Sequence, residues 1–228
     1  MKFASKLIIA VALLSAGTAA SASISDPVGD FLPTYAGPAN PDVDILSGNV
    51  EFDGTNFYFS ESANGPIGST PNSLFVWAVN RGGGIARPAA APPAGAGILW
   101  DAVVVMFPDG TLRVVTFPSS GPPTTTNLLG GTTVSGNSLS ASLAALLLPS
   151  TGFAPADYTF SLWSRVRAAS GVDGPNTEVA DLLSGSGSIT ATSVPEPATW
   201  LSMLLGFTAI GLAFRRTNRR PGKLLPGT

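Results

Sequence analysis

Short runs of β-branched and aromatic residues, separated by turns rich in Gly, Pro and Asn, fill residues 23–183 of this 228-residue chain. Such turns join strands into hairpins, and three of them stand out: Asp53-Gly54-Thr55-Asn56, Pro108-Asp109-Gly110 and Ser135-Gly136-Asn137. No segment of this region has a sustained helical period, and Pro149 ends a short helical turn expected at Ser142–Leu148. The pattern predicts an all-β fold, a single antiparallel β-sandwich over residues 23–183.

Other patterns separate buried strands from loops within this region. The run Leu74–Val79 is apolar at odd and even positions alike, which is typical of a strand buried on both faces. Residues 87–97 and 119–127 contain clusters of Pro, Ala and Thr, and we expect surface loops there. Residues 184–193, Ser-Gly-Ser-Gly-Ser-Ile-Thr-Ala-Thr-Ser, predict a flexible linker after the domain.

Residues 1–22 have the organisation of a secretory signal peptide. Its three parts are a positive n-region at Lys2 and Lys6, an apolar run at Leu7–Leu14, and small residues before a cleavage site at Ala20 and Ala22. The apolar run is well short of the roughly 20 residues that span a bilayer, which favours cleavage over a permanent anchor. We therefore expect the mature chain to begin near Ser23.

A second targeting pattern follows the domain. Two prolines hold Pro195-Glu196-Pro197 extended, and a 17-residue apolar stretch, 198–214, comes next. This length is at the lower edge of what crosses a bilayer, so the stretch predicts a transmembrane helix. Arg215 and Arg216 follow directly. The positive-inside rule then places residues 221–228 in the cytoplasm as a tail and the β domain outside.

This arrangement resembles the PEP-CTERM sorting domain of exosortase substrates in Gram-negative bacteria. The matching features within residues 194–220 are Pro195-Glu196-Pro197, Trp200, the apolar segment, and an arginine cluster that begins with Arg215 and Arg216. The resemblance implies an exosortase as partner, which would cleave near the motif while the protein is transiently anchored in the inner membrane and faces the periplasm. The product would then reach the cell surface or extracellular matrix. The alternative is an ordinary single-pass anchor that is never cut.

Missing residue types restrict the chemistry of the exported domain. The chain has no Cys and no His, and its only lysines, Lys2, Lys6 and Lys223, lie in or beyond the terminal segments. This excludes disulfides, Ser–His–Asp and Cys–His catalysis, Ser–Lys dyads and ordinary zinc sites. Five arginines and thirteen acidic residues between positions 23 and 194 give a net charge of −8. Nucleic acid and anionic lipid are therefore disfavoured as partners.

Four aspartates near the start of the domain form its most distinctive polar cluster: Asp26, Asp30, Asp42 and Asp44. Calcium prefers oxygen ligands such as carboxylates, so the four are candidate calcium ligands, although their spacing is not that of an EF-hand. The alternative is structural, because aspartates in these positions also cap turns and fix the entry to a strand. No other cofactor is expected.

Two features favour carbohydrate recognition. Residues 25–117 resemble DOMON-type and related carbohydrate-binding β-sandwich modules, through an acidic-glycine turn at 26–30 and the run Val-Glu-Phe-Asp-Gly-Thr-Asn-Phe-Tyr-Phe. Haem-binding members use His, so its absence disfavours a redox role. Aromatic residues could also stack on sugars: the pattern places Trp77 and Trp163 in the core and leaves Trp100 and Tyr35 as candidates for exposure.

The sequence thus predicts an exported, exosortase-processed surface or extracellular-matrix protein. Its domain is interpreted as a non-catalytic binding or structural module associated with exopolysaccharide. Two alternatives remain open. One is a carboxylate-based glycan hydrolase, for which Asp101 is the acid that apolar neighbours could enclose. The other is a purely structural matrix protein with no small ligand.

Overall fold

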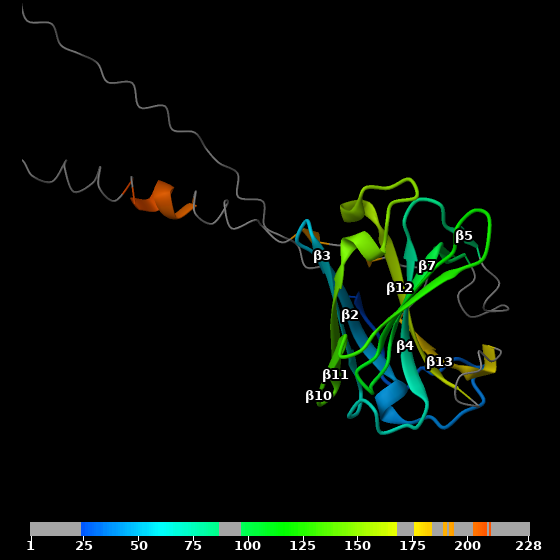
Figure 1. The fold of residues 1–228 in the computed structure, drawn as a ribbon. Helices are drawn as coiled ribbons and strands as arrows, with labels where there is room; N and C mark the ends of the chain where they lie inside the picture. The colour runs from blue at the N-terminus through cyan, green and yellow to red at the C-terminus, as the bar shows by residue number, and fades with distance from the viewer. Residues whose placement is uncertain are drawn as a thin grey trace, which may run out of the picture.

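The computed structural model describes residues 24–86, 97–167, 176–183, 189–190, 192–193, 203–208 and 210. Over these residues the chain forms two large β-sheets that face each other (Figure 1) and a separate two-stranded sheet of β5 (Ile85–Ala86) and β6 (Leu99–Trp100). Neighbouring strands along each sheet pair antiparallel. The predicted all-β class is confirmed.

The six-stranded sheet has the order β1-β2-β3-β11-β10, and β15 pairs with β2 in parallel. Its strands are β1 Ile24–Ser25, β2 Ile45–Phe52, β3 Asn56–Ala63, β10 Thr132–Ser135, β11 Ser138–Ala144 and β15 Thr192–Ser193. Asp53 accepts hydrogen bonds from the Thr55 and Asn56 amides and closes the predicted β2–β3 hairpin. The predicted β10–β11 hairpin is also present.

The seven-stranded sheet has the order β13-β12-β4-β7-β8-β9, and β14 pairs with β12. Its strands are β4 Ser73–Asn80, β7 Ala102–Met106, β8 Leu112–Thr116, β9 Thr124–Leu128, β12 Thr159–Val166, β13 Val179–Leu182 and β14 Ile189–Thr190. The strand β4 is buried at every position, as its apolar run predicts. Single turns of 3₁₀ helix lie at Pro41–Val43, Ala145–Leu147, Pro155–Asp157 and Asn176–Glu178.

Aromatic side chains from both sheets make the core between them. The Phe59 ring of β3 lies 5.6 Å from the Trp77 ring of β4 and 5.7 Å from the Phe160 ring of β12, measured between centroids. Each fully buried side chain of this size contributes about 2–3 kcal/mol through the hydrophobic effect. A glycine is required at position 48, because a Cβ there would lie 2.9 Å from the Trp77 ring.

Two local predictions need correction. The loop expected at 119–127 ends early, because Thr124–Leu128 is the edge strand β9; its β-branched threonines favour extended backbone despite the prolines before them. The helical turn expected at Ser142–Leu148 is shorter, since β11 continues to Ala144 before the 3₁₀ turn. Most of the loop predicted at 87–97 lies outside the described residues.

The C-terminal region is described only in part. Within the range predicted as a linker, β14 pairs with β12 and β15 pairs with β2, so these residues add to both sheets. Of the predicted transmembrane stretch 198–214, positions 203–208 and 210 are described as helical. No helix among the described residues combines the length and the apolar character that a bilayer crossing requires. The predicted signal peptide, 1–22, and tail, 221–228, lie outside the described residues.

Candidate functional site

The seven-stranded sheet is apolar on its outer face as well as on its inner face. Alternate residues of β4 and β7 turn away from the main core and form a second apolar cluster with a neighbouring tryptophan: Leu74, Val76, Ala78, Trp100, Val103 and Val105. Antiparallel sheets of this kind commonly have one packed face and one solvated, polar face. The outer face of this sheet is therefore built to be covered.

Aromatic side chains border the second cluster and turn this face into a groove of about 510 Å³. Trp163 of β12 packs along one side, next to Val76 in the strand register. At one end the rings of Trp100 and Phe117 meet edge to face with centroids 5.0 Å apart. Trp163 and Phe117 are half-buried, so part of each rigid ring can pack against a ligand with little loss of conformational entropy, whereas Trp100 is almost buried and supports Phe117.

Arginines supply the charge around this groove. Arg113, Arg165 and Arg167 line it, and none of its described lining residues is acidic. The Nε and Nη2 atoms of Arg165 lie 3.0 and 2.9 Å from Glu178 Oε2, which fixes this side chain against β13. Arg113 Nε donates a hydrogen bond of 2.9 Å to Asn127 Oδ1 on β9. The positive charge is thus held in place at two borders of the groove, on β8 and on β12.

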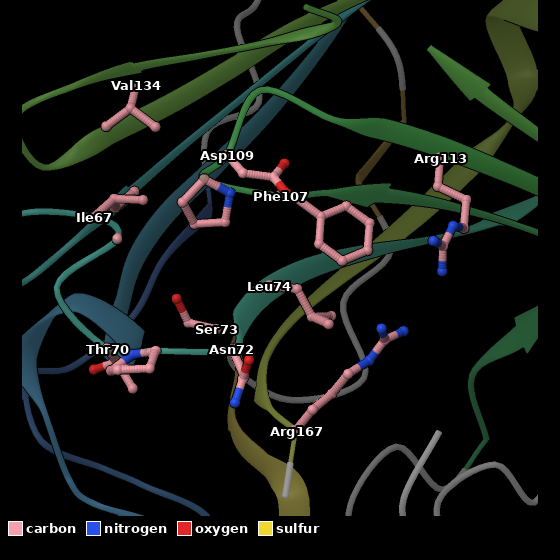
Figure 2. A pocket seen from close by; sticks show the side chains of 13 residues that line it. Ile67, Thr70, Asn72, Ser73, Leu74, Phe107, Asp109, Arg113, Val134 and Arg167 are labelled. Atoms are coloured by element: carbon pink, nitrogen blue, oxygen red, sulfur yellow. The ribbon is translucent and has the colours of Figure 1, made fainter. Parts of the chain in front are cut away.

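A second pocket of about 630 Å³ adjoins the groove and shares Leu74, Arg113 and Arg167 with it. Figure 2 shows both arginines beside Phe107, at the end of β7. The guanidinium carbon of Arg113 lies 5.1 Å from the ring centroid of Phe107, and that of Arg167 lies 5.6 Å from it. Both distances are within the reach of cation–π attraction. The pocket and the groove therefore adjoin at these three shared residues.

The predicted aromatic residues are divided between core and groove. Trp77 and Tyr158 are fully buried in the main core, as predicted for Trp77. Trp163 was expected in the core, but it is half-buried and borders the groove instead. Trp100 was expected to be exposed, and this is wrong, because only 8% of it is accessible. Tyr35 is half-buried in a loop, where its hydroxyl donates to Pro38 O.

Two of the four predicted calcium ligands serve the fold instead. Asp42 is buried and accepts hydrogen bonds from the amide and the hydroxyl of Thr70, at 2.7 and 2.5 Å. Asp44 accepts from the Gly29 amide and from Asn64 Nδ2. Both carboxylates thereby fix loops at the start of the domain, which is the structural alternative that the sequence left open.

The other two, Asp26 and Asp30, meet a residue that the sequence did not single out. Their carboxylate oxygens and one of Asp181 all lie within 4.8 Å of one another. Asp181 is buried and accepts hydrogen bonds from the Ile45 and Leu182 amides. Burial raises the pKa of Asp181 to about 7, and the nearby Asp26 charge adds to the rise. The β13 edge brings Asp181 here from more than 130 positions away, which no local pattern reveals.

Asp101, the candidate acid of the hydrolase alternative, has a structural role. It interrupts the extended run between β6 and β7 and is 2% exposed. Its Oδ1 lies 2.9 Å from Arg81 Nε, and its Oδ2 accepts hydrogen bonds from the Gly83 amide and the Thr151 hydroxyl. The carboxylate is therefore enclosed by polar partners, not by apolar side chains as the hydrolase hypothesis required.

Glu61 is a titratable residue that sequence reasoning missed. It occupies an inward position of β3, is 3% exposed, and accepts a hydrogen bond of 2.7 Å from Trp77 Nε1. Burial raises the pKa of Glu61 well above its ordinary value, and the Trp77 hydrogen bond opposes the rise only in part. The alternation Phe57, Phe59, Glu61 along β3 was the available signal. Its place inside the core makes it a determinant of stability.

Residues 193–220 match the family model of the PEP-CTERM protein-sorting motif. The chain therefore carries a PEP-CTERM sorting motif, and this motif indicates export and targeting to an exosortase. No curated protein and no solved structure matches the chain significantly. The matched segment begins at Ser193, the last residue of β15.

The individual sorting residues lie outside the described part of the structure, and their roles stay predictions. These residues are Pro195, Glu196, Pro197, Trp200, Arg215 and Arg216, together with Ala20 and Ala22 of the signal peptide. The weaker resemblance of residues 25–117 to DOMON-type modules also stays a prediction.

Proposed function

We propose that this protein is a non-catalytic component of the cell surface or extracellular matrix whose β-sandwich binds extracellular polysaccharide. The observation that carries the proposal is the groove on the outer face of the seven-stranded sheet, with its apolar floor and its aromatic border of Trp100, Phe117 and Trp163. An exosortase-targeted protein is exported to where such polymers are found.

The shape of the groove favours an extended ligand. Its floor crosses β12, β4, β7 and β8, so that a bound chain would contact several strands at once. Aromatic faces suit the apolar faces of sugar rings, and the arginines between them supply hydrogen-bond donors for hydroxyl and acidic groups. A net charge of −8 over residues 23–194 argues against nucleic acid as the occupant.

Catalysis is the less favoured alternative. A carboxylate-based glycosidase needs two acids that flank the scissile bond. The described lining of the groove holds no acid, and that of the adjoining pocket holds one, Asp109. Asp109 accepts a hydrogen bond from the Thr111 amide in the β7–β8 turn, which assigns it a structural task. We therefore propose that the domain binds its polymer without cleaving it.

Binding is tested with polysaccharide from the producing organism's own extracellular material. Isothermal titration calorimetry with Trp163→Ala should show a loss of affinity of about tenfold or more, because a large aromatic contact in the groove is removed. Tyr58→Ala is the matched control: Tyr58 is 39% exposed on the outer face of the other sheet, and its removal should leave the affinity unchanged. Equal effects of the two variants, or no binding by the unaltered protein, would contradict the proposal.

The proposed binding of polysaccharide would also be overturned if two copies of the protein associate through the groove. Light scattering should show a monomer in both the unaltered protein and Trp163→Ala. If the unaltered protein is a dimer and the variant a monomer, a second copy of the chain covers this face.

The sorting route has its own test. We propose that the signal peptide is removed near Ala22, that residues 198–214 anchor the chain transiently in the inner membrane, and that an exosortase cleaves near Pro195–Pro197. Mass spectrometry of the secreted protein should then find a mature chain that starts near Ser23 and ends near the motif. A secreted species that still contains Trp200 and residues 201–214 would exclude this processing.

A further inference from the structure

We propose that the pocket around Phe107, Arg113 and Arg167 binds the carboxylate of an acidic sugar, so that the polymer bound by this protein is a uronate-containing polysaccharide. This inference rests on the proposed function and specifies its ligand. The proposed site is the 630 Å³ pocket that adjoins the groove at Leu74.

The first observation is that two arginine side chains lie against the same aromatic ring. The guanidinium carbons of Arg113 and Arg167 lie 5.1 and 5.6 Å from the centroid of Phe107. Two guanidinium groups close to one ring place positive charge on this side of the pocket, and positive charge attracts an anion. Arginine also recognises carboxylates through paired N–H donors.

Arg113 keeps donors for such an anion. Its Nε is used by Asn127 Oδ1 at 2.9 Å, which fixes the orientation of the planar group. Within the described part of the chain, its two Nη atoms make no hydrogen bond. Figure 2 shows the guanidinium directed toward Phe107 and the recess below it. The side chain is therefore oriented in advance, and its terminal nitrogens face the pocket.

Ser73 is the second, independent observation. This first residue of β4 is 6% exposed and lines the pocket, and its hydroxyl has no hydrogen-bond partner among the described residues. Figure 2 shows its oxygen on the side of the pocket toward Ile67, away from the two arginines, so it would contact another part of the bound sugar than the carboxylate. A buried hydroxyl without a partner costs free energy, and a ligand atom that accepts its proton removes this cost.

The neighbouring turn is built so that Ser73 is held in this position. Asp42 binds Thr70 through two hydrogen bonds, and the Ser73 amide donates to Thr70 O at 3.3 Å. Asn72 between them has a positive φ of 62°, a conformation that non-glycine residues seldom adopt. Its carbonyl accepts the Arg167 amide, so the turn also positions that arginine. Asn is among the non-glycine residues that tolerate this conformation best, so the turn can form here and hold both Ser73 and Arg167.

The local charge is opposite to that of the whole domain. Between residues 23 and 194 acids outnumber arginines by thirteen to five, yet the described lining of this pocket has two arginines and one acid, Asp109. Local positive charge on an otherwise acidic surface selects anionic groups at short range and repels anionic polymers elsewhere. An acidic polysaccharide would therefore bind along one path only.

The test compares two polymers that differ in one charge per sugar. Isothermal titration calorimetry with the mature secreted protein should give at least a tenfold higher affinity for polygalacturonate than for its fully methyl-esterified form, because esterification removes the charged acceptor. This preference should shrink as the salt concentration rises, because salt screens partly exposed charges.

Substitutions that remove a positive or a negative charge from the pocket make this test more specific. Arg113→Gln should lower the affinity for polygalacturonate about tenfold and leave that for the ester nearly unchanged, and Asp109→Asn should raise the former. Ser73→Ala should weaken polygalacturonate binding without lowering the thermal stability of the free protein, since no hydrogen bond is lost in the fold.

The outcomes separate this inference from the proposal beneath it. Three outcomes would overturn the acidic-sugar inference: equal affinity for the two polymers, binding of neither polymer, or the same response to Arg113→Gln and Asp109→Asn. If the organism's own polysaccharide still binds in a way that depends on Trp163, the proposed function stands. Absence of both kinds of binding would overturn the proposed function as well.

Discussion

The outer faces of the two sheets differ in a way that their shared architecture does not require. On the six-stranded sheet, β3 and β11 present a ladder of facing pairs: Ser62 with Ser138, Ser60 with Ser140, and Tyr58 with Ser142. On the seven-stranded sheet, the corresponding ladder across β4, β7 and β8 pairs Val76 with Val105, Ala78 with Val103, and Val103 with Val115. One face has the chemistry of a solvated surface, and the other has the chemistry of a core.

This contrast locates function on one side of the molecule. Both inner faces pack in the same core, so the apolar outer residues of the seven-stranded sheet are not needed to hold the sheets together. An exported domain gains nothing from an apolar recess unless a ligand or partner uses it. The serine ladder, formed by these pairs on β3 and β11, serves as the internal control: its own recess of about 440 Å³ is lined mainly by Ser, Thr, Gly and Tyr58, and its described lining includes no arginine.

The largest expected effect comes from a charge placed on each face. Val103→Asp should lower the free energy of unfolding by about 3 kcal/mol, because Val103 is 8% exposed and its register neighbours are Ala78 and Val115. Ser140→Asp, on the exposed ladder, should change it by less than about 0.5 kcal/mol. Urea denaturation measures both variants. Similar losses in the two would show that the faces are not distinct.

A smaller effect is expected from the buried acids. Burial raises the pKa of Glu61, on the inner face of the six-stranded sheet, and raises that of Asp181, beside β2, to about 7. Between their ordinary pKa values and these raised values the unfolded chain binds fewer protons than the folded one. The free energy of unfolding should therefore fall as the pH rises from 5 to 8, and the shift of Asp181 alone accounts for about 2 kcal/mol of this fall.

Glu61→Gln separates this effect from the general repulsion within an acidic domain. The variant keeps an acceptor for Trp77 Nε1 but cannot ionise, so the decline in stability with pH should become shallower. Chemical denaturation at pH 5 and pH 8 measures the slope. An unchanged slope would mean that Glu61 does not titrate in the unfolding equilibrium.

The smallest effect concerns the edges of the two sheets. A chain that ends at residue 183 lacks β14 on β12 and β15 on β2, whereas one that ends at 193 keeps both. The shorter chain should be less stable by about 1 kcal/mol, the net worth of one or two backbone hydrogen bonds. Thermal denaturation compares them. Equal stability would support the flexible linker predicted for residues 184–193.

The fold was largely readable from local pattern. Alternation in Ser138–Ala144 and the unbroken apolar run at Leu74–Val79 predict one strand with a solvated face and one buried on both sides, and both are observed. The hairpin turns at 53–56 and 135–137 were equally clear. These features depend on neighbours in sequence, which is why they could be predicted.

The site depends on register and on distant partners, which the sequence hides. Trp100 looked exposed because Asp101 follows it, yet Asp101 is buried against Arg81, 20 positions away. Arg113 and Arg167 meet at Phe107 only because β12 and β8 lie on either side of the β4–β7 pair. The sequence indicated that β4 has two apolar faces, but not which side chains would border the second one.

The most direct test of the account follows backbone amide chemical shifts by NMR while polysaccharide from the producing organism is added to the mature protein. We predict shifts in β8, in β12, and around Ser73, Phe107 and Trp163, with β3 and β11 unchanged. Shifts concentrated on the serine ladder of β3 and β11, or none around the groove, would contradict the claim that the outer face of the seven-stranded sheet is the binding surface.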